Sequence, residues 1–135
     1  MSTIQEIPVD HIQGVWDSVK GYLEKGLSHS GGEYTVDQLK VFLTQGQSTL
    51  IVILDDSNKI KGALTVEWNN YPNARIAFMT AIGGATCQES FNMFCEWVKW
   101  RGGTAIRGAA FESVARLWKK KFGFENRYIT VEKKL

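Results

Sequence analysis

The stretch Thr80-Ala-Ile-Gly-Gly-Ala-Thr86 decides the fold, because the spacing of apolar residues changes across it. Before it, residues 75–81 have the pattern of a strand, and after it Thr86-Cys-Gln-Glu89 has the form of a capping box that begins a helix. Small residues at such a junction let backbone N–H groups face a ligand, and the helix dipole adds positive potential. The stretch predicts a pyrophosphate cradle; the alternative is a simple turn from strand into helix.

The chain after this stretch alternates between helices and strands. A helical stripe runs to Gly102-Gly103, a short apolar strand follows at 104–110, and a second helical stripe ends at Gly123. Residues 127–132 then alternate like a half-buried final strand. A crossover from strand through helix to strand predicts a parallel pair with a right-handed connection.

Two helices are expected near the N-terminus. Apolar residues recur at three- and four-residue steps over residues 11–28, with Asp10 as the N-cap. The segment 28–32 ends this helix. Thr35-Val-Asp-Gln38 has the form of another capping box, and it begins a shorter helix that Gly46 closes.

Three strands follow these helices along the chain. The runs 49–54, 60–68 and 75–81 are separated by turn sequences at 55–59 and 69–73, which predicts an antiparallel meander. Together with the crossover, they predict an α+β fold: a mixed, mainly antiparallel sheet flanked by about four helices. At 135 residues, the whole chain is expected to form a single domain.

Composition restricts the class of protein. Hydrophobic residues make up 44% and charged residues 22%, which is typical of a globular protein. The net charge of +2 is too small to indicate nucleic-acid binding, although residues 116–135 carry +5 and the remainder −3. Cys87 and Cys95 form no disulfide framework or zinc motif, and no apolar run is long enough for a membrane span. The sequence therefore predicts a cytoplasmic protein without a metal, nucleic-acid or membrane partner.

The order of these elements resembles the GNAT acetyltransferase superfamily over roughly residues 4 to 135. In that family a Gln or Arg, two variable residues, a Gly, another variable residue and a Gly or Ala bind the pyrophosphate of coenzyme A. Gly83 and Ala85 match the small positions, whereas Thr80 stands where the Gln or Arg is expected. The resemblance implies acetyl-CoA as cosubstrate. It also implies a set of binding residues: Thr80, Ala81, Ile82, Gly83, Gly84, Ala85, Thr86 and Arg116.

A second family signature ends the last helix with Gly-Phe. Ala115, Gly123 and Phe124 match it, with Trp118 at the apolar position. Lys119 replaces the tyrosine that usually protonates the departing thiolate, so the resemblance makes Lys119 the candidate acid. The alternative is that its ammonium group holds phosphate charge near the cofactor. The basic face of this helix, which includes Arg116, has three interpretations: a solvated surface, a phosphate anchor or a patch for an acidic partner.

Acetyl transfer needs a neutral amine, and therefore a base beside it. Glu67 is the only carboxylate within the central strands and is the candidate base, with an exposed strand carboxylate as the alternative. Trp68, Asn69 and Tyr71 are the candidate acceptor-binding rim, or they cover the edge of the core. The two histidines, His11 and His29, lack partners at metal-ligand spacing and are interpreted as surface or cap residues.

Within the superfamily, the chain resembles small GNAT-like proteins of tailed bacteriophages. The resemblance rests on the short chain, the helix with Trp16, the segment Ser30-Gly-Gly-Glu-Tyr-Thr35 and the Gly-Gly turn. Two functions follow. One is an acetyl-CoA-dependent N-acetyltransferase that modifies a primary amine of a small molecule or protein by direct attack. The other is a noncatalytic GNAT-like phage protein, either a virion component or a binder of a host protein. The acceptor would lie at the meander edge, at the first helices or on a second subunit of a homo-oligomer.

Overall fold

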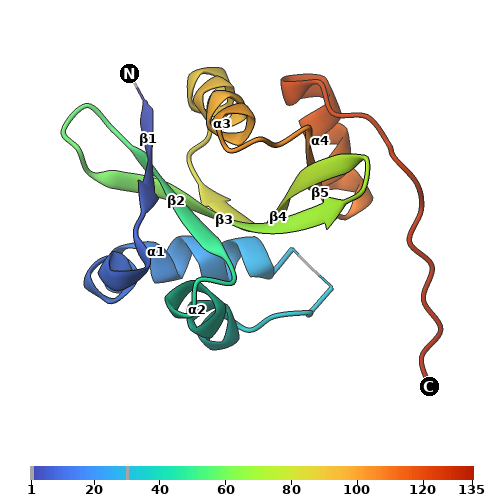
Figure 1. The fold of residues 1–135 in the computed structure, drawn as a ribbon, viewed down its shortest axis with the longest axis horizontal. Coiled ribbons are helices and arrows are strands. Elements are labelled where there is room, and N and C mark those ends of the chain that lie inside the picture. The colour runs from blue at the N-terminus through green and yellow to red at the C-terminus, as the bar shows by residue number, and fades with distance from the viewer. Residues whose placement is uncertain (1, 30) are drawn as a thin grey trace.

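The computed structural model describes residues 2–29 and 31–135, and it is built around a five-stranded sheet with the order β1-β2-β3-β4-β5 (Figure 1). The first four strands are antiparallel to their neighbours, and β5 lies parallel to β4. The predicted fold class and the predicted parallel pair are confirmed. The strands are β1 Thr3–Ile7, β2 Thr49–Leu54, β3 Ile60–Tyr71, β4 Ala74–Gly84 and β5 Ala105–Gly108.

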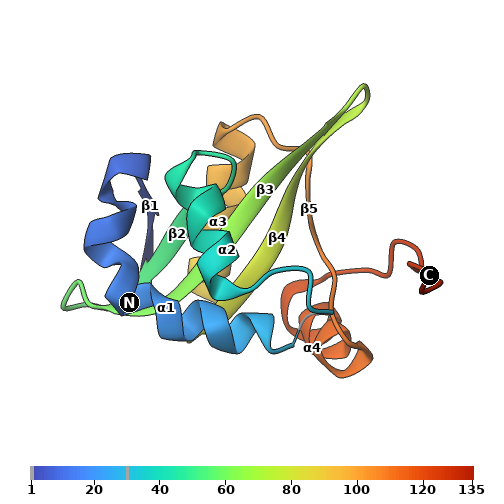
Figure 2. The ribbon, with the colours of Figure 1, turned by 90° about the horizontal axis from the view of Figure 1, so that it is seen from below.

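Helices cover both faces of this sheet. Figures 1 and 2 show α1 and α2 on one face and α3 and α4 on the other. A short 3-10 helix, Val9–His11, precedes α1. The helices are α1 Ile12–Leu27, α2 Val36–Thr44, α3 Gln88–Trp100 and α4 Glu112–Phe122.

Each face of the sheet carries its own apolar cluster. On the α1 and α2 face, Leu50 and Val52 pack with Leu23, whereas Ile51 faces Phe94 on the α3 face. Because both faces are covered, the four central residues of β2, from Leu50 to Ile53, are all buried, and its sequence is an apolar run rather than an alternating one. This explains why the sequence 49–54 predicts a strand without strict alternation.

Local signals predicted several helix ends correctly. Thr35 accepts a hydrogen bond from the backbone N–H of Gln38, and the Gln38 side chain accepts one from the N–H of Thr35, which confirms this capping box. Gly123 adopts a left-handed conformation after α4, as expected for a glycine that ends a helix. The predicted cap at Asp10 is wrong, because Asp10 lies inside the 3-10 helix and its side chain caps nothing.

One strand was missed, and two further predictions are wrong. The strand β1 was not predicted, because its five residues lack strict alternation, yet it pairs with β2 at the sheet edge. The turn expected at 69–73 is shorter, since β3 continues to Tyr71. Residues 127–132 form no strand and lie exposed after α4. Ser30, within the predicted turn 28–32, lies outside the described residues.

Candidate functional site

A β-bulge in β4 opens the sheet beside β5. Thr65 of β3 pairs with Ala81 and Val66 pairs with Met79, so Thr80 is an extra residue with no partner in the ladder. The hydroxyl oxygens of Thr80 and Thr65 lie 2.6 Å apart. A bulge bends its strand and increases the local twist. Consequently β4 pairs with β5 only as far as Met79, and it continues to Gly84 without a strand along that edge.

Two adjoining cavities lie at this opening. The first, of about 160 Å³, lies between the end of β4, the C-terminal end of α1 and the residues Val114 and Trp118 of α4. The second, of about 320 Å³, lies between the loop after α1 and the middle of the sheet. Both are lined by five common residues: His29, Met79, Thr80, Ala109 and Ala110. The bulge at Thr80 therefore lies where the two cavities meet.

Glu67 lies in the second cavity with Tyr34. The Tyr34 hydroxyl donates a hydrogen bond of 3.2 Å to Oε2 of Glu67, and both side chains are half-buried. Burial, followed by the negative charge of Glu67, raises the pKa of Tyr34 above its usual value, so the phenol keeps its proton at neutral pH. The ring of Tyr34 is held edge-on against Phe42 of α2 at 5.7 Å. Tyr34 therefore fixes one carboxylate oxygen of Glu67 inside the cavity.

The glycines of the predicted cradle serve close packing. They continue β4 instead of forming a turn, so the prediction of a turn at Gly83-Gly84 is wrong. A Cβ atom at Gly83 would lie 1.9 Å from the carbonyl oxygen of Tyr22 in α1. Gly84 has a φ of 90°, and a Cβ there would lie 2.5 Å from the Cα of Gly62. The next residue, Ala85, donates its N–H to the Lys61 carbonyl.

The N-cap of α3 lies one residue later than predicted. The N-cap is Cys87 and not Thr86: the Cys87 sulfur accepts a hydrogen bond from the N–H of Ser90, and the Cys87 N–H donates to Oγ of Ser90. Thr86 instead lines the first cavity, and its carbonyl accepts a hydrogen bond from Nζ of Lys121. A lysine of α4 therefore lies beside the start of α3.

The two cysteines, both free, should differ in reactivity. Hydrogen bonds from Ser90, first from its side chain and then from its backbone, lower the pKa of Cys87 to about 7, whereas burial raises the pKa of Cys95. Because the thiolate is the nucleophile, the alkylation rate of Cys87 is expected to be half-maximal near pH 7. Peptide mapping after timed iodoacetamide treatment measures this. Replacing Ser90 with alanine should shift the Cys87 midpoint upward, and faster labelling of Cys95 at pH 7 would contradict the expectation.

Several predicted site residues lie outside both cavities. Lys119 and Arg116 are exposed on α4 and line neither cavity. Asn69 pairs with Ile76 near the end of β3, and Tyr71 is 54% exposed at its tip. Residues 80–84, Thr86 and Glu67 all line the cavities, whereas Ala85 does not. The structure thus brings Glu67 and most of the predicted cofactor segment together.

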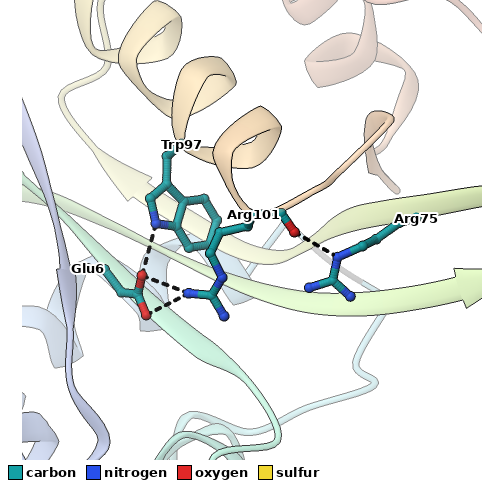
Figure 3. A network of polar contacts seen from close by, with 4 residues as sticks. All are labelled: Glu6, Arg75, Trp97 and Arg101. Atoms are coloured by element: carbon teal, nitrogen blue, oxygen red, sulfur yellow. Dashed lines mark hydrogen bonds and ion pairs between the residues drawn. The ribbon is translucent and has the colours of Figure 1, made fainter.

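Trp68 faces the opposite side of the sheet from Glu67. Its ring packs against Trp97 of α3, and the guanidinium of Arg75 lies 3.9 Å from its centroid. Figure 3 shows the polar network beside it: the Glu6 carboxylate accepts hydrogen bonds from Nε1 of Trp97 and from Arg101, and Nε of Arg75 donates to the Arg101 carbonyl. This network joins β1, β4 and the end of α3, so Trp68 belongs to the packing of that face.

Sequence reasoning missed His29 and Tyr34 at the site, and it placed Lys121 in the basic cluster of the last helix without its contact to Thr86. His29 was interpreted as a surface or cap residue, yet it lines both cavities. Tyr34 and Lys121 gave no signal as partners of Glu67 and Thr86, because each pair is more than 30 residues apart in sequence. Among residues 2–29 and 31–135, no group of three or more His, Cys, Asp or Glu is placed to hold a metal ion. No helix in the same ranges is long and apolar enough to cross a membrane.

No protein-family model and no curated protein sequence matches the chain. Several solved structures do match the chain. An aminoglycoside acetyltransferase from an uncultured soil metagenomic sample is 14% identical with a TM-score of 0.68, covering 99% of this chain and 96% of that one. Glucosamine-6-phosphate N-acetyltransferase from Arabidopsis thaliana is 11% identical with a TM-score of 0.60, and the coverage is 99% and 98%.

A third similar structure was solved with acetyl-CoA. It is described as a predicted acetyltransferase from Clostridium acetobutylicum, and it is 12% identical with a TM-score of 0.64, covering 99% of this chain and 96% of that one. Identities this low establish similarity of fold. The chain therefore has the fold of the GNAT acetyltransferases.

Proposed function

We propose that this protein is an acetyl-CoA-dependent N-acetyltransferase that acts on a cationic primary amine. The observation that carries the proposal is the bulge at Thr80, where two cavities adjoin across the opening between β4 and β5. One cavity ends beside a helix N-terminus and a lysine, and the other contains a carboxylate. Two substrates bound in the two cavities would meet at this opening.

The first cavity fits coenzyme A through the backbone of β4 and the end of α4. The edge of β4 beyond Met79 has no strand partner, and such an edge suits the amide groups of a pantetheine arm. Because the N–H of Ala85 already has a partner, the phosphates fit better beside Thr86, where Lys121 and the start of α3 supply positive potential. Arg116 and Lys119 are exposed on the same helix without the contact to Thr86 that Lys121 makes, so they would act on phosphate only at longer range.

The second cavity fits a positively charged acceptor. Its lining contains Glu33 and Glu67 together with Phe78 and Phe111, and no described residue of the lining is Lys or Arg. Carboxylates and aromatic rings both attract ammonium groups, whereas a phosphorylated acceptor would be repelled. In this respect the cavity suits an amine of the aminoglycoside kind better than a sugar phosphate.

The chemistry assigned to this chain is removal of a proton. Acetyl-CoA, when bound, supplies an acetyl thioester. Glu67, held by Tyr34, accepts a proton from the acceptor ammonium directly or through one water, which frees the nitrogen lone pair. The amide bond then forms as the carbon–sulfur bond breaks. The phenol of Tyr34 keeps its proton at neutral pH and is a candidate donor to the departing thiolate, a role that the exposed Lys119 is poorly placed to fill.

Calorimetric titration with acetyl-CoA tests the cofactor site. The unmodified chain should bind, and Lys121→Gln should weaken binding about tenfold, as expected for the loss of one charge-assisted hydrogen bond. Lys120→Gln is the matched control, because both lysines are exposed on the same helix but only Lys121 bonds to Thr86, and Lys120→Gln should leave the affinity unchanged. No heat of binding, or equal losses in the two variants, would contradict the assignment.

The alternative remains a noncatalytic GNAT-like protein, including a component of a phage particle or a binder of a host protein. Thr80 at the position of the family's Gln or Arg and Lys119 at that of its tyrosine favour it. Bound acetyl-CoA without turnover of any amine would support this alternative. Mass spectrometry of purified virions would then test the particle role.

A further inference from the structure

Thr65 and Thr80 face each other at the bulge and form a pair of hydroxyl groups whose protons are unequally used. Thr65 is fully buried, and within the described part of the chain its hydroxyl has one hydrogen-bond partner, the hydroxyl of Thr80 at 2.6 Å. A hydroxyl donates one proton, and a buried donor without an acceptor is costly. Thr65 therefore donates to Thr80, since the opposite direction would leave the Thr65 proton unpaired inside the protein.

The proton of Thr80 is left for a ligand. Another acceptor within its reach is the carbonyl oxygen of Thr65 at 3.4 Å, which lies beyond the ~3.0 Å limit of an ordinary O–H···O hydrogen bond. Thr80 is half-buried and lines both cavities. A group bound at the opening between them can therefore accept this proton at a shorter distance than the protein itself offers.

Thr80 is also the best-placed donor at this opening. Of the five residues that line both cavities, His29 and Thr80 have side chains that can donate a hydrogen bond. His29 is exposed, and water weakens a hydrogen bond to a charged group, whereas Thr80 is half-buried. Tyr34 lines the second cavity alone, and its hydroxyl is already bonded to Glu67.

We propose that the Thr80 hydroxyl, oriented by Thr65, donates a hydrogen bond to the sulfur of coenzyme A as the sulfur leaves the acetyl group. This inference rests on the proposed function, because it needs a thioester at the opening. When the carbon–nitrogen bond forms and the carbon–sulfur bond breaks, the electron pair of the broken bond stays on sulfur, and Thr80 shares its proton with that charge without losing it. The acceptor ammonium gives up two protons: one neutralises the sulfur, and the other leaves to solvent. Thr80 is then a catalytic residue, and Thr65 is a positioning residue.

Titration of the thiol of bound coenzyme A tests this assignment without turnover. The far-ultraviolet absorbance of the thiolate is followed against pH, and the complex with desulfo-coenzyme A serves as the blank for the two cysteines of the protein. A donor to the thiolate lowers the pKa of the thiol, so Thr80→Ala should raise that pKa by about one to two units, the loss expected for one hydrogen bond to a charged group. The same variant should lower kcat by about tenfold to a hundredfold with little change in KM for acetyl-CoA.

Thr65→Ala is the matched control. It removes the same hydrogen bond between the two hydroxyls but keeps the donor, so the pKa of the bound thiol should move less than in Thr80→Ala. Thr80→Ser keeps a hydroxyl and should bring the pKa back towards that of the unmodified chain. The charged groups around the opening stay the same in all these variants, so their effects on the thiol cancel: Glu33 and Glu67 on the side of the second cavity, His29 at both cavities, and Lys121 on the side of the first.

Three results would overturn this role of Thr80 and leave the proposed function intact. One is a bound thiol with the same pKa in the unmodified chain and in Thr80→Ala. Another is an equal rise in Thr80→Ala and Thr65→Ala, which would indicate an effect of packing. The third is a rise in His29→Gln without one in Thr80→Ala, which would assign the donor to His29. Failure of the unmodified chain to bind coenzyme A would contradict the proposed function and this inference together.

Discussion

Replacing Gly26 with alanine is expected to lower the free energy of unfolding by about 3 kcal/mol or more, because the new methyl group would clash with the backbone of the sheet. A Cβ at this position would lie 2.3 Å from the carbonyl oxygen of Ile82, which is a backbone atom of β4. Relief would require α1 to move away from the sheet, and α1 packs on β4 through the buried residues Val19 and Leu23. Thermal and urea unfolding followed by circular dichroism measure the loss.

The matched control lies five residues earlier in the same helix. Gly21 is exposed and a Cβ there meets nothing within 4 Å, so Gly21→Ala should raise stability by up to about 1 kcal/mol through helix propensity alone. Gly83→Ala places its methyl group on the other side of the same contact, 1.9 Å from the Tyr22 carbonyl oxygen, and should be at least as damaging as Gly26→Ala. Stabilisation by Gly26→Ala would show that α1 and β4 do not approach this closely.

Replacing Glu67 with glutamine is expected to reduce kcat for acetyl transfer by about 10²- to 10⁴-fold, the usual contribution of a general base. Glutamine keeps the size and the carbonyl oxygen that can accept the Tyr34 hydrogen bond, but it cannot accept a proton at neutral pH. Acetyl-CoA affinity should not change, because Glu67 does not line the first cavity. Steady-state kinetics with a panel of primary amines and a thiol-detecting reagent measure both parameters.

Glu33 provides the control for charge. It lines the same cavity and is exposed, so Glu33→Gln should raise KM for a cationic amine with little change in kcat. Tyr34→Phe removes the hydrogen bond to Glu67 and should lower kcat by less than Glu67→Gln does. Part of the rate lost in Glu67→Gln should return at high pH, where the free amine no longer needs a base. An unchanged kcat in Glu67→Gln would remove Glu67 from the proton path.

Patterns of apolar residues predicted most elements, and they failed where pairing depended on distant residues. Residues 127–132 alternate as a strand does, yet alternation states only which face a residue would use and not whether a neighbouring strand is present. Similarly, Gly83-Gly84 suggested a turn because glycine is common there, whereas its cause is the close approach of α1 and β3 to β4. That contact joins positions about 20 to 60 residues apart along the chain, and no local pattern reveals it.

Amino-acid patterns were enough to predict the helices, the caps at Thr35 and Gly123, the meander and the parallel crossover, because these follow from local spacing and chain connection. The sequence also identified Glu67 as the candidate base and the segment 80–84 as part of the candidate cofactor-binding site. The tertiary structure alone decided that Thr80 is a bulge, since a bulge is a property of the register between two strands. It likewise brought Tyr34 to Glu67 and Lys121 to Thr86. A site made of side chains from separate elements exists only once packing has fixed how those elements lie against one another.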